Sequence, residues 1–178
     1  HGAPCEYFEN EFKDHIVIQR QGGFQQSYNC MLNTTTWYTG PGLLLSRQKF
    51  GEMYTYELIA NTPVDDGVSQ CWHAVLYKGQ NVPPSEEDLA AAKQAQEAAL
   101  FAFSADFDVW QHKAPAIRVM QMKQDGPFKH VRKWGAQFYA DRADVGKVQE
   151  ELNGVMHIER FNEPDADHRE FDKDLFTD

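Results

Sequence analysis

Apolar and polar residues alternate through much of the first half of the chain. Side chains two residues apart lie on the same face of a strand, so this period predicts β-structure. Short segments containing Gly, Pro or Asp separate the alternating stretches, and strands joined by such turns form an antiparallel meander. A sheet of this kind can bury one face and leave the other in water. We expect strands within residues 15–21, 27–40, 43–50, 52–67 and 68–79.

The period changes near residue 85. Ser85 is followed by three acidic residues at 86–88, a pattern typical of a helix start. A serine caps the first turn, and acidic side chains are stabilised at the amino-terminal end of the helix dipole. The helix is expected to continue to about Lys113, because Pro115 stops it. A second helical segment is predicted over residues 130–145.

The first predicted helix has a broad apolar face, and Asp106 lies in the middle of it. Asp108 falls on the opposite, polar side. An amphipathic helix that crosses a curved antiparallel sheet leaves a cavity suited to an apolar ligand. We therefore predict an α+β fold with such a cavity. At about 100° per residue the expected apolar face contains Leu89, Ala92, Ala95, Ala99, Leu100, Ala102, Phe103, Phe107, Val109 and Trp110.

Composition narrows the function classes. A chain of 178 residues can form one domain with a real core, so residues 1–178 are treated as a single domain. The net charge of -10 argues against nucleic acid as a partner, and the absence of a run of about 18 apolar residues argues against a membrane span. Three scattered cysteines indicate a reducing cytoplasm rather than a disulfide framework. The chain does not start with Met, which suggests a processed chain or a fragment.

Asp106 has two interpretations. A buried, ionised carboxylate must be paired or bound to a metal, because an isolated buried charge is too costly. Asp106 is therefore either a metal ligand beneath the helix or a helix-end residue hydrogen-bonded to a neighbouring strand. The residues leave both interpretations open.

Several common catalytic motifs are missing. The sequence has neither a Gly-rich phosphate loop nor a G-x-S-x-G elbow. Cys71 and His73 have the C-x-H spacing of one half of a Rieske iron–sulfur site, but the C-x-x-H partner is missing. Both lie in a predicted strand and are interpreted as ordinary sheet residues facing one side. The seven histidines include no H-x-x-x-H or H-E-x-x-H pair.

The second half of the chain carries a set of motifs seen together in one family. Asp106, Trp110 and His112-Lys113 form D-x-x-x-W-x-H-K, and residues 125–127 form D-G-P. Residues 132–139 then read R-K-W-x-x-Q-F-Y. These motifs resemble the oxygenase component of Rieske-type 3-ketosteroid 9α-hydroxylases and related sterol oxygenases. The amino-terminal HGAPCEYFENEF and the turn TGPG are also similar to that family.

The resemblance implies a catalytic domain of helix-grip type (START/Bet v1-like), with an antiparallel sheet wrapped on a long C-terminal helix. It also implies a mononuclear Fe(II) held by two His and one Asp, of which His1 and Asp106 are the matching residues here. The other His, a nearby Asn and the Rieske [2Fe-2S] domain would lie upstream of residue 1. The chain therefore resembles the C-terminal part of a larger oxygenase, or a relative without its front half.

For function, the resemblance implies hydroxylation of a steroid or similar polycyclic molecule with O₂ and two electrons. A flavin and iron–sulfur reductase would supply the electrons, and a homotrimer is the expected assembly. Aromatic and Met residues from strands within 27–80, with Phe103, would line an apolar pocket of steroid size.

Two other functions compete with the oxygenase. The first is a non-enzymatic helix-grip carrier of a hydrophobic ligand, without a functional metal site. It predicts that Asp106→Ala leaves ligand affinity intact or improves it, since a buried polar group is removed. The second is a degenerate homologue that acts only in assembly.

Overall fold

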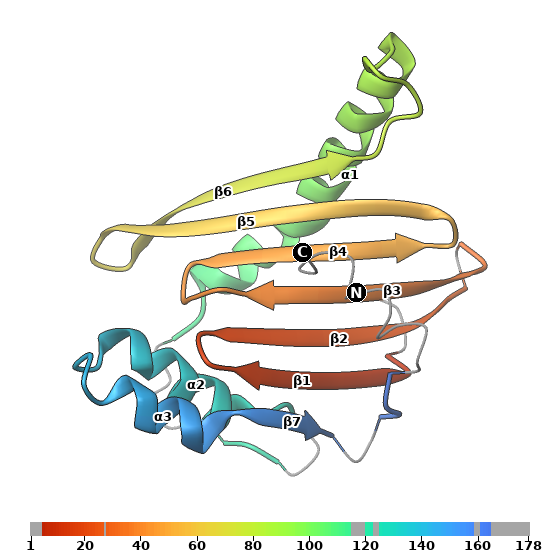
Figure 1. Ribbon diagram of the computed structural model, residues 1–178. Coiled ribbons are helices and arrows are strands. Elements are labelled where there is room, and N and C mark those ends of the chain that lie inside the picture. The colour runs from red at the N-terminus through yellow and green to blue at the C-terminus, as the bar shows by residue number, and fades with distance from the viewer. Residues whose placement is uncertain (1–4, 27, 115–119, 123–124, 159–160, 165–178) are drawn as a thin grey trace.

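One antiparallel sheet organises the part of the chain that the structure describes. This computed structural model describes residues 5–26, 28–114, 120–122, 125–158 and 161–164. Within those ranges the sheet has seven strands in the order β6-β5-β4-β3-β2-β1-β7 (Figure 1). The strands are β1 (Tyr7–Lys13), β2 (Ile16–Gln25), β3 (Cys30–Tyr38), β4 (Leu43–Phe50), β5 (Met53–Asp65), β6 (Val68–Tyr77) and β7 (Gly154–His157).

The predicted antiparallel meander is confirmed. Strands β2 to β6 occupy the five expected segments, and each pairs antiparallel with the next. Strand β1 was not predicted, because its sequence YFENEFK carries two glutamates. Arg20 on β2 compensates both charges, since its guanidinium nitrogens lie 2.8 Å from Glu9 Oε1 and 2.8 Å from Glu11 Oε2. Strand β7 has only 4 residues, too few to show a period.

The first predicted helix is confirmed as α1 (Glu86–Gln111). Ser85 and Asp88 form a capping box at its start: Ser85 Oγ accepts from the Asp88 amide at 3.2 Å, and Asp88 Oδ2 accepts from the Ser85 amide at 3.0 Å. Although α1 has 26 residues, no helix among the described residues is long and apolar enough to cross a bilayer.

The apolar face expected of α1 was too broad. Leu89, Leu100 and Val109 are exposed, because the helix packs chiefly along the edge strand β6 and buries only a narrow stripe. The half-buried stripe consists of Ala91, Ala92, Ala95, Gln96, Ala99, Phe103, Asp106 and Phe107.

The second helical segment predicted over residues 130–145 is confirmed in its first part, but it is not one continuous helix. The segment contains α2 (Phe128–Ala136) and a 3₁₀ turn, η1 (Gln137–Tyr139), and the next helix is α3 (Val145–Leu152). Gln137 Nε2 donates to the Trp134 carbonyl at 3.0 Å. In a longer α2 that carbonyl would have accepted a hydrogen bond from a backbone amide of the next turn. Ala140 is then extended, with φ -85° and ψ 160°. The expectation of a long C-terminal helix was also wrong, since α3 has 8 residues and the long helix lies in mid-chain.

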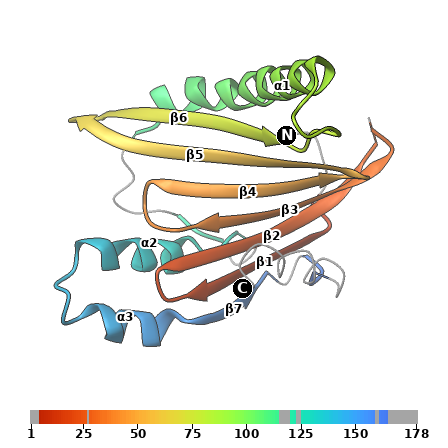
Figure 2. The same cartoon turned by 45° about the horizontal axis from the view of Figure 1, so that its top comes forward.

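The helices lie at two ends of the sheet. Helix α1 lies beside β6, whereas α2 and α3 lie beside β1, β2 and β7 (Figures 1 and 2). We call the side of the sheet that meets the helices the inner face. At its β1 end a core forms from Phe12, Val17, Trp134 and Leu152. The α+β class is thus confirmed, in a helix-grip-like arrangement.

Candidate active site

A cavity of about 820 Å³ lies between α1 and the inner face of the sheet. Helix α1 contributes alanines and aromatic rings to its wall, and strands β2 to β5 contribute the floor. The residues on which the argument depends are Tyr38, Ser46, Gln48, Phe50, Glu57, Ala99, Phe103, Asp106 and Trp110. The cavity predicted between helix and sheet is therefore present.

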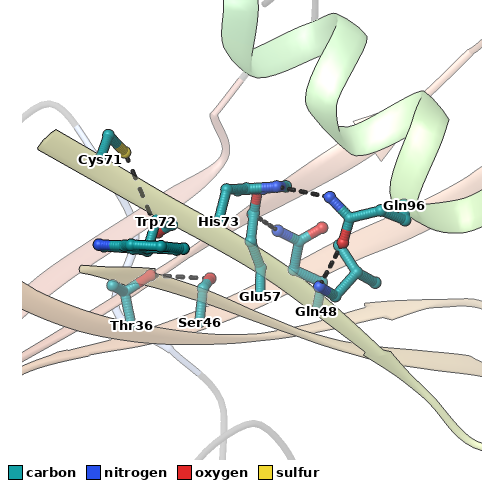
Figure 3. A network of polar contacts seen from close by, with 9 residues as sticks. Thr36, Ser46, Gln48, Glu57, Cys71, Trp72, His73 and Gln96 are labelled. Atoms are coloured by element: carbon teal, nitrogen blue, oxygen red, sulfur yellow. Dashed lines mark hydrogen bonds and ion pairs between the residues drawn. The ribbon is translucent and has the colours of Figure 1, made fainter. Parts of the chain in front are cut away.

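The floor of the cavity is more polar than expected. The strand register places Thr36 opposite Ser46, and Ser46 opposite Glu57. The hydroxyls of Thr36 and Ser46 are 3.0 Å apart and share a hydrogen bond (Figure 3). This rung of polar side chains crosses the inner face, because alternation directs every second residue of each strand to the same side.

The expected aromatic lining is present only in part. Tyr38, Phe50 and Phe103 line the cavity. Trp37 is buried with 1% of its surface exposed, but it is one residue out of phase with Tyr38 and so points to the opposite face. Met53 is exposed. Burial raises the pKa of the Tyr38 phenol.

Asp106 lies at the cavity wall and is half-buried. Three aromatic rings of α1 surround this part of the helix. Phe103 lies 5.0 Å from Phe107 and 5.6 Å from Trp110 between ring centroids. Asp108, two residues later, is exposed. The carboxylate is thus placed where it can meet a molecule or ion in the cavity, but its role as a metal ligand stays a prediction.

Asp106 is the one residue of the expected iron site that lies among the described residues. No three His, Cys, Asp or Glu side chains in the described part of the chain gather into a metal-binding group. A half-buried carboxylate facing a cavity is an oxygen ligand suited to Fe(II), so Asp106 fits one position of the site. His1 lies outside the described residues. Cys5, four positions after it, lines the same cavity as Asp106.

His73 belongs to a hydrogen-bonded network, as expected of an ordinary sheet residue. Its Nε2 lies 2.6 Å from Glu57 Oε1, and its Nδ1 lies 2.9 Å from Nε2 of Gln96 on α1 (Figure 3). Gln48 Nε2 donates to the second oxygen of Glu57 at 2.8 Å. Pattern reasoning missed Glu57, Gln48 and Gln96. For Gln48 and Glu57 the signal was the shared period-two phase of neighbouring strands, whereas Gln96 lies on α1 and had no such signal.

Asp88 connects the start of α1 to the end of β6. Besides its capping box, its carboxylate accepts from the Gln80 amide at 2.7 Å and from Asn81 Nδ2 at 3.0 Å. The backbone amides of Gln80 and Ser85, followed by the Asn81 side chain, hold the pKa of Asp88 well below its usual range. Gly79 allows this approach, since a Cβ there would lie 3.1 Å from the Asp88 carboxyl carbon. This anchoring sets where α1 runs over the cavity.

Three of the remaining motif residues stabilise the fold. Trp134 lies in the core, with 4% of its surface exposed. Gln137 is buried, and its Oε1 accepts from Gln149 Nε2 on α3 at 2.9 Å. Asp125 Oδ2 accepts from the Met122 amide at 2.7 Å in the turn before α2. Asp125, Trp134 and Gln137 of the D-G-P and R-K-W-x-x-Q-F-Y motifs therefore stabilise the end of the sheet that lies farthest from α1.

A second cavity of about 600 Å³ lies at that end. It shares Cys5, Gln21 and Tyr38 with the first, so the two cavities adjoin along the inner face. Its walls include Asn10 and Trp134. Asn10 Nδ2 and Trp134 Nε1 are buried without a hydrogen-bond partner among the described residues.

A comparison with known families decides which family the chain represents. The family described as the 3-ketosteroid 9alpha-hydroxylase C-terminal domain matches residues 1–139. The chain belongs to this family. The matched residues include both the cavity strands and α1, so this member of the 3-ketosteroid 9α-hydroxylase C-terminal domain family has its Asp106 within the matched region.

Curated relatives carry the same description. The 3-ketosteroid-9-alpha-monooxygenase oxygenase component of Rhodococcus rhodochrous is 26% identical over 173 residues, which is 89% of this chain and 44% of the relative. The corresponding component of Mycolicibacterium smegmatis is 25% identical, over 90% of this chain and 46% of the relative. That of Mycobacterium tuberculosis is 25% identical, over 81% and 40%. The chain spans less than half the length of these relatives.

Proposed function

We propose that the chain is the catalytic-domain portion of a Rieske non-haem iron oxygenase that hydroxylates a steroid or similar polycyclic molecule with O₂. One observation carries the proposal: in a chain of this family, Asp106 lies at the wall of a cavity of about 820 Å³. Ligand sites typically enclose about 300–1,000 Å³, a range that includes the volume needed for a fused-ring molecule. The carrier alternative finds no support among the relatives, which are oxygenase components.

In this proposal Asp106 is the carboxylate ligand of Fe(II), and His1 is one of the imidazole ligands. When bound, the iron supplies the activation of O₂ that an unactivated C–H bond requires. The chain itself binds and orients the substrate. Phe103 and Trp110 lie beside Asp106 on the cavity wall, where they hold an apolar ring system against the reacting centre and exclude water.

The electron-transfer parts belong to the proposal as well. The Rieske [2Fe-2S] cluster, a flavin and iron–sulfur reductase and a homotrimeric assembly are the parts that this function needs outside residues 1–178. The net charge of -10 at neutral pH argues against nucleic acid as a partner.

The test compares two aspartates on the same helix. In the oxygenase supplied with its reductase, Asp106→Ala is expected to lower the iron content by the one mononuclear iron per subunit, leaving the irons of the Rieske cluster, and to abolish steroid hydroxylation. Asp108→Ala is the matched control, because Asp108 is exposed two residues away, and it should retain both iron and turnover. Iron is measured by metal analysis after anaerobic loading with Fe(II). If Asp106→Ala keeps its iron and its turnover, the proposed function is wrong.

A further inference from the structure

Glu57 is a carboxylate in the cavity with a well-defined set of hydrogen-bond donors. It comes from β5 and lines the cavity floor, and 17% of its side-chain surface is exposed. His73 Nε2 contacts Oε1 at 2.6 Å, and Gln48 Nε2 donates to Oε2 at 2.8 Å (Figure 3). These two contacts fix the orientation of the carboxylate plane from two neighbouring strands.

The direction of the His73 hydrogen bond follows from Gln96. The Val75 amide donates to Gln96 Oε1 at 2.7 Å, so the NH₂ group of Gln96 faces His73 Nδ1 at 2.9 Å. Nδ1 therefore accepts, and Nε2 carries the ring proton. It follows that Nε2–H donates to Glu57. Phe103 stacks on the imidazole at 5.2 Å between centroids and 18° between planes, which fixes the ring.

Glu57 consequently acts as an acceptor at both oxygens. A carboxylate accepts hydrogen bonds at both oxygens and has about four lone-pair positions. His73 and Gln48 take two of them. The remaining acceptor positions belong to a side chain that lines the cavity, where a bound ligand can reach them.

We propose that Glu57 is a specificity-determining residue that selects a ligand with a hydroxyl group over the same ligand with a ketone at that position. This inference rests on the proposed function and specifies its substrate. A hydroxyl donates to the carboxylate, and a hydrogen bond to a charged group is stronger than one between neutral groups. A ketone oxygen brings a second acceptor against the carboxylate and leaves its remaining acceptor positions desolvated without a donor. The preferred substrate is a polycyclic alcohol whose hydroxyl meets Glu57.

Three steroid probes and two variants test the proposal by calorimetric titration of the 178-residue chain. The probes are androstanedione, with a ketone at each end, and the two hydroxyketones made from it by reducing one ketone at a time. At least one hydroxyketone is expected to bind about tenfold or more tightly than the diketone. In Glu57→Gln the preference should fall to about twofold or less, because an amide can donate to a ketone as well as accept from a hydroxyl.

Glu97→Gln is the control, since it removes the same charge from the solvent side of α1, where Glu97 is 68% exposed. It should keep the wild-type preference. Circular dichroism and thermal unfolding establish that each variant is folded, and Gln48→Leu provides a second variant that loosens Glu57 without removing its charge. In Gln48→Leu the preference should weaken but persist.

The outcomes separate the two proposals. A hydroxyl preference that disappears in Glu57→Gln and persists in Glu97→Gln supports the role of Glu57. Binding of all three probes with equal affinity, or a preference that survives Glu57→Gln, overturns that role and leaves the steroid oxygenase standing. If none of the probes binds to the wild-type chain, the steroid-binding function itself fails, and the selectivity of Glu57 fails with it.

Discussion

The two ends of the inner face differ in how the helices cover the same sheet. At the β1 end, large side chains from α2 and α3 form a core in which Trp134 packs on Phe12 and Val17, beside the smaller cavity of about 600 Å³. At the β6 end, α1 presents alanines such as Ala95 and Ala99 to the sheet, and a cavity of about 820 Å³ remains. The hydrophobic core therefore lies at one end, and the larger of the two cavities lies at the other.

This difference explains why the family motifs divide into two groups. The residues from Trp134 to Gln137 serve the packed end, where Gln137 connects α2, α3 and, at 3.3 Å, the carbonyl of Asp14 in the turn between β1 and β2. Asp106 and Trp110 serve the open end. A resemblance to a family thus covers residues with quite different tasks, and only part of it concerns chemistry.

The largest expected effect is a loss of stability when a core side chain at the β1 end is truncated. Trp134→Ala should lower the free energy of unfolding by about 3–5 kcal/mol, because it removes a large buried side chain and leaves a cavity. Trp72→Ala is the matched control on the exposed face of β6, where Trp72 is 66% exposed, and it should change stability by about 0.5 kcal/mol or less. Urea unfolding measures both. Equal losses would contradict the assignment of the core to this end.

A smaller effect, on ligand binding, is expected when a larger side chain is placed in the cavity beneath α1. Ala99→Leu adds a side chain to the cavity wall and should weaken binding of a steroid probe about tenfold or more, while the free energy of unfolding changes by about 1 kcal/mol or less. Ala98→Leu, at an exposed position of the same helix, should leave binding unchanged. Calorimetric titration measures the affinity for the steroid probe, and urea unfolding measures the free energy of unfolding. A loss of stability as large as that of Trp134→Ala would show that this end is densely packed.

The smallest effect concerns the anchor of α1 and depends on pH. The folded-state pKa of Asp88 is lowered by the Gln80 and Ser85 amides and by Asn81, so its ionised form stabilises the fold. That contribution is fully present above the unfolded pKa of about 4 and is lost as pH falls below it toward the folded pKa. Asp88→Asn should therefore be less stable than wild type at pH 7, with the difference shrinking below about pH 4. Urea unfolding across this range measures it.

Glu87→Gln is the control for this pH series. Glu87 lies in the same first turn but is exposed, so its variant should follow the wild-type pH dependence closely. A difference between Asp88→Asn and wild type that stays constant from pH 7 to pH 3 would contradict the role given to the Asp88 carboxylate.

Local patterns predicted the elements whose signal is contained in a few neighbouring residues. Five strands, the start of α1 at Ser85 and its capping box all follow from period, turn residues and cap chemistry. The α+β class follows from those elements together. The position of Asp106 on the inward side of α1 could also be expected, because a helix of known register places Phe103 and Asp106 on one side.

Elements that depend on distant partners could not be predicted in this way. Strand β1 is recognisable only once Arg20 is known to pair with Glu9, and β7 only once its pairing with β1 is known. The same holds for Glu57, His73 and Gln96, which come from two strands and a helix (Figure 3). The length of α2 was also missed, because the side chain that ends it, Gln137, competes for a backbone carbonyl.

The short strand β7 has a consequence for where this fold can be cut. The family match ends at residue 139. Residues 154–157, however, pair with β1 and cover its otherwise unpaired edge. Leu152 belongs to the hydrophobic core. A polypeptide trimmed to the matched region would expose the unpaired backbone amide and carbonyl groups of β1. Such an exposed edge strand favours edge-to-edge aggregation. The segment that completes this sheet is therefore longer than the segment that the family model matches.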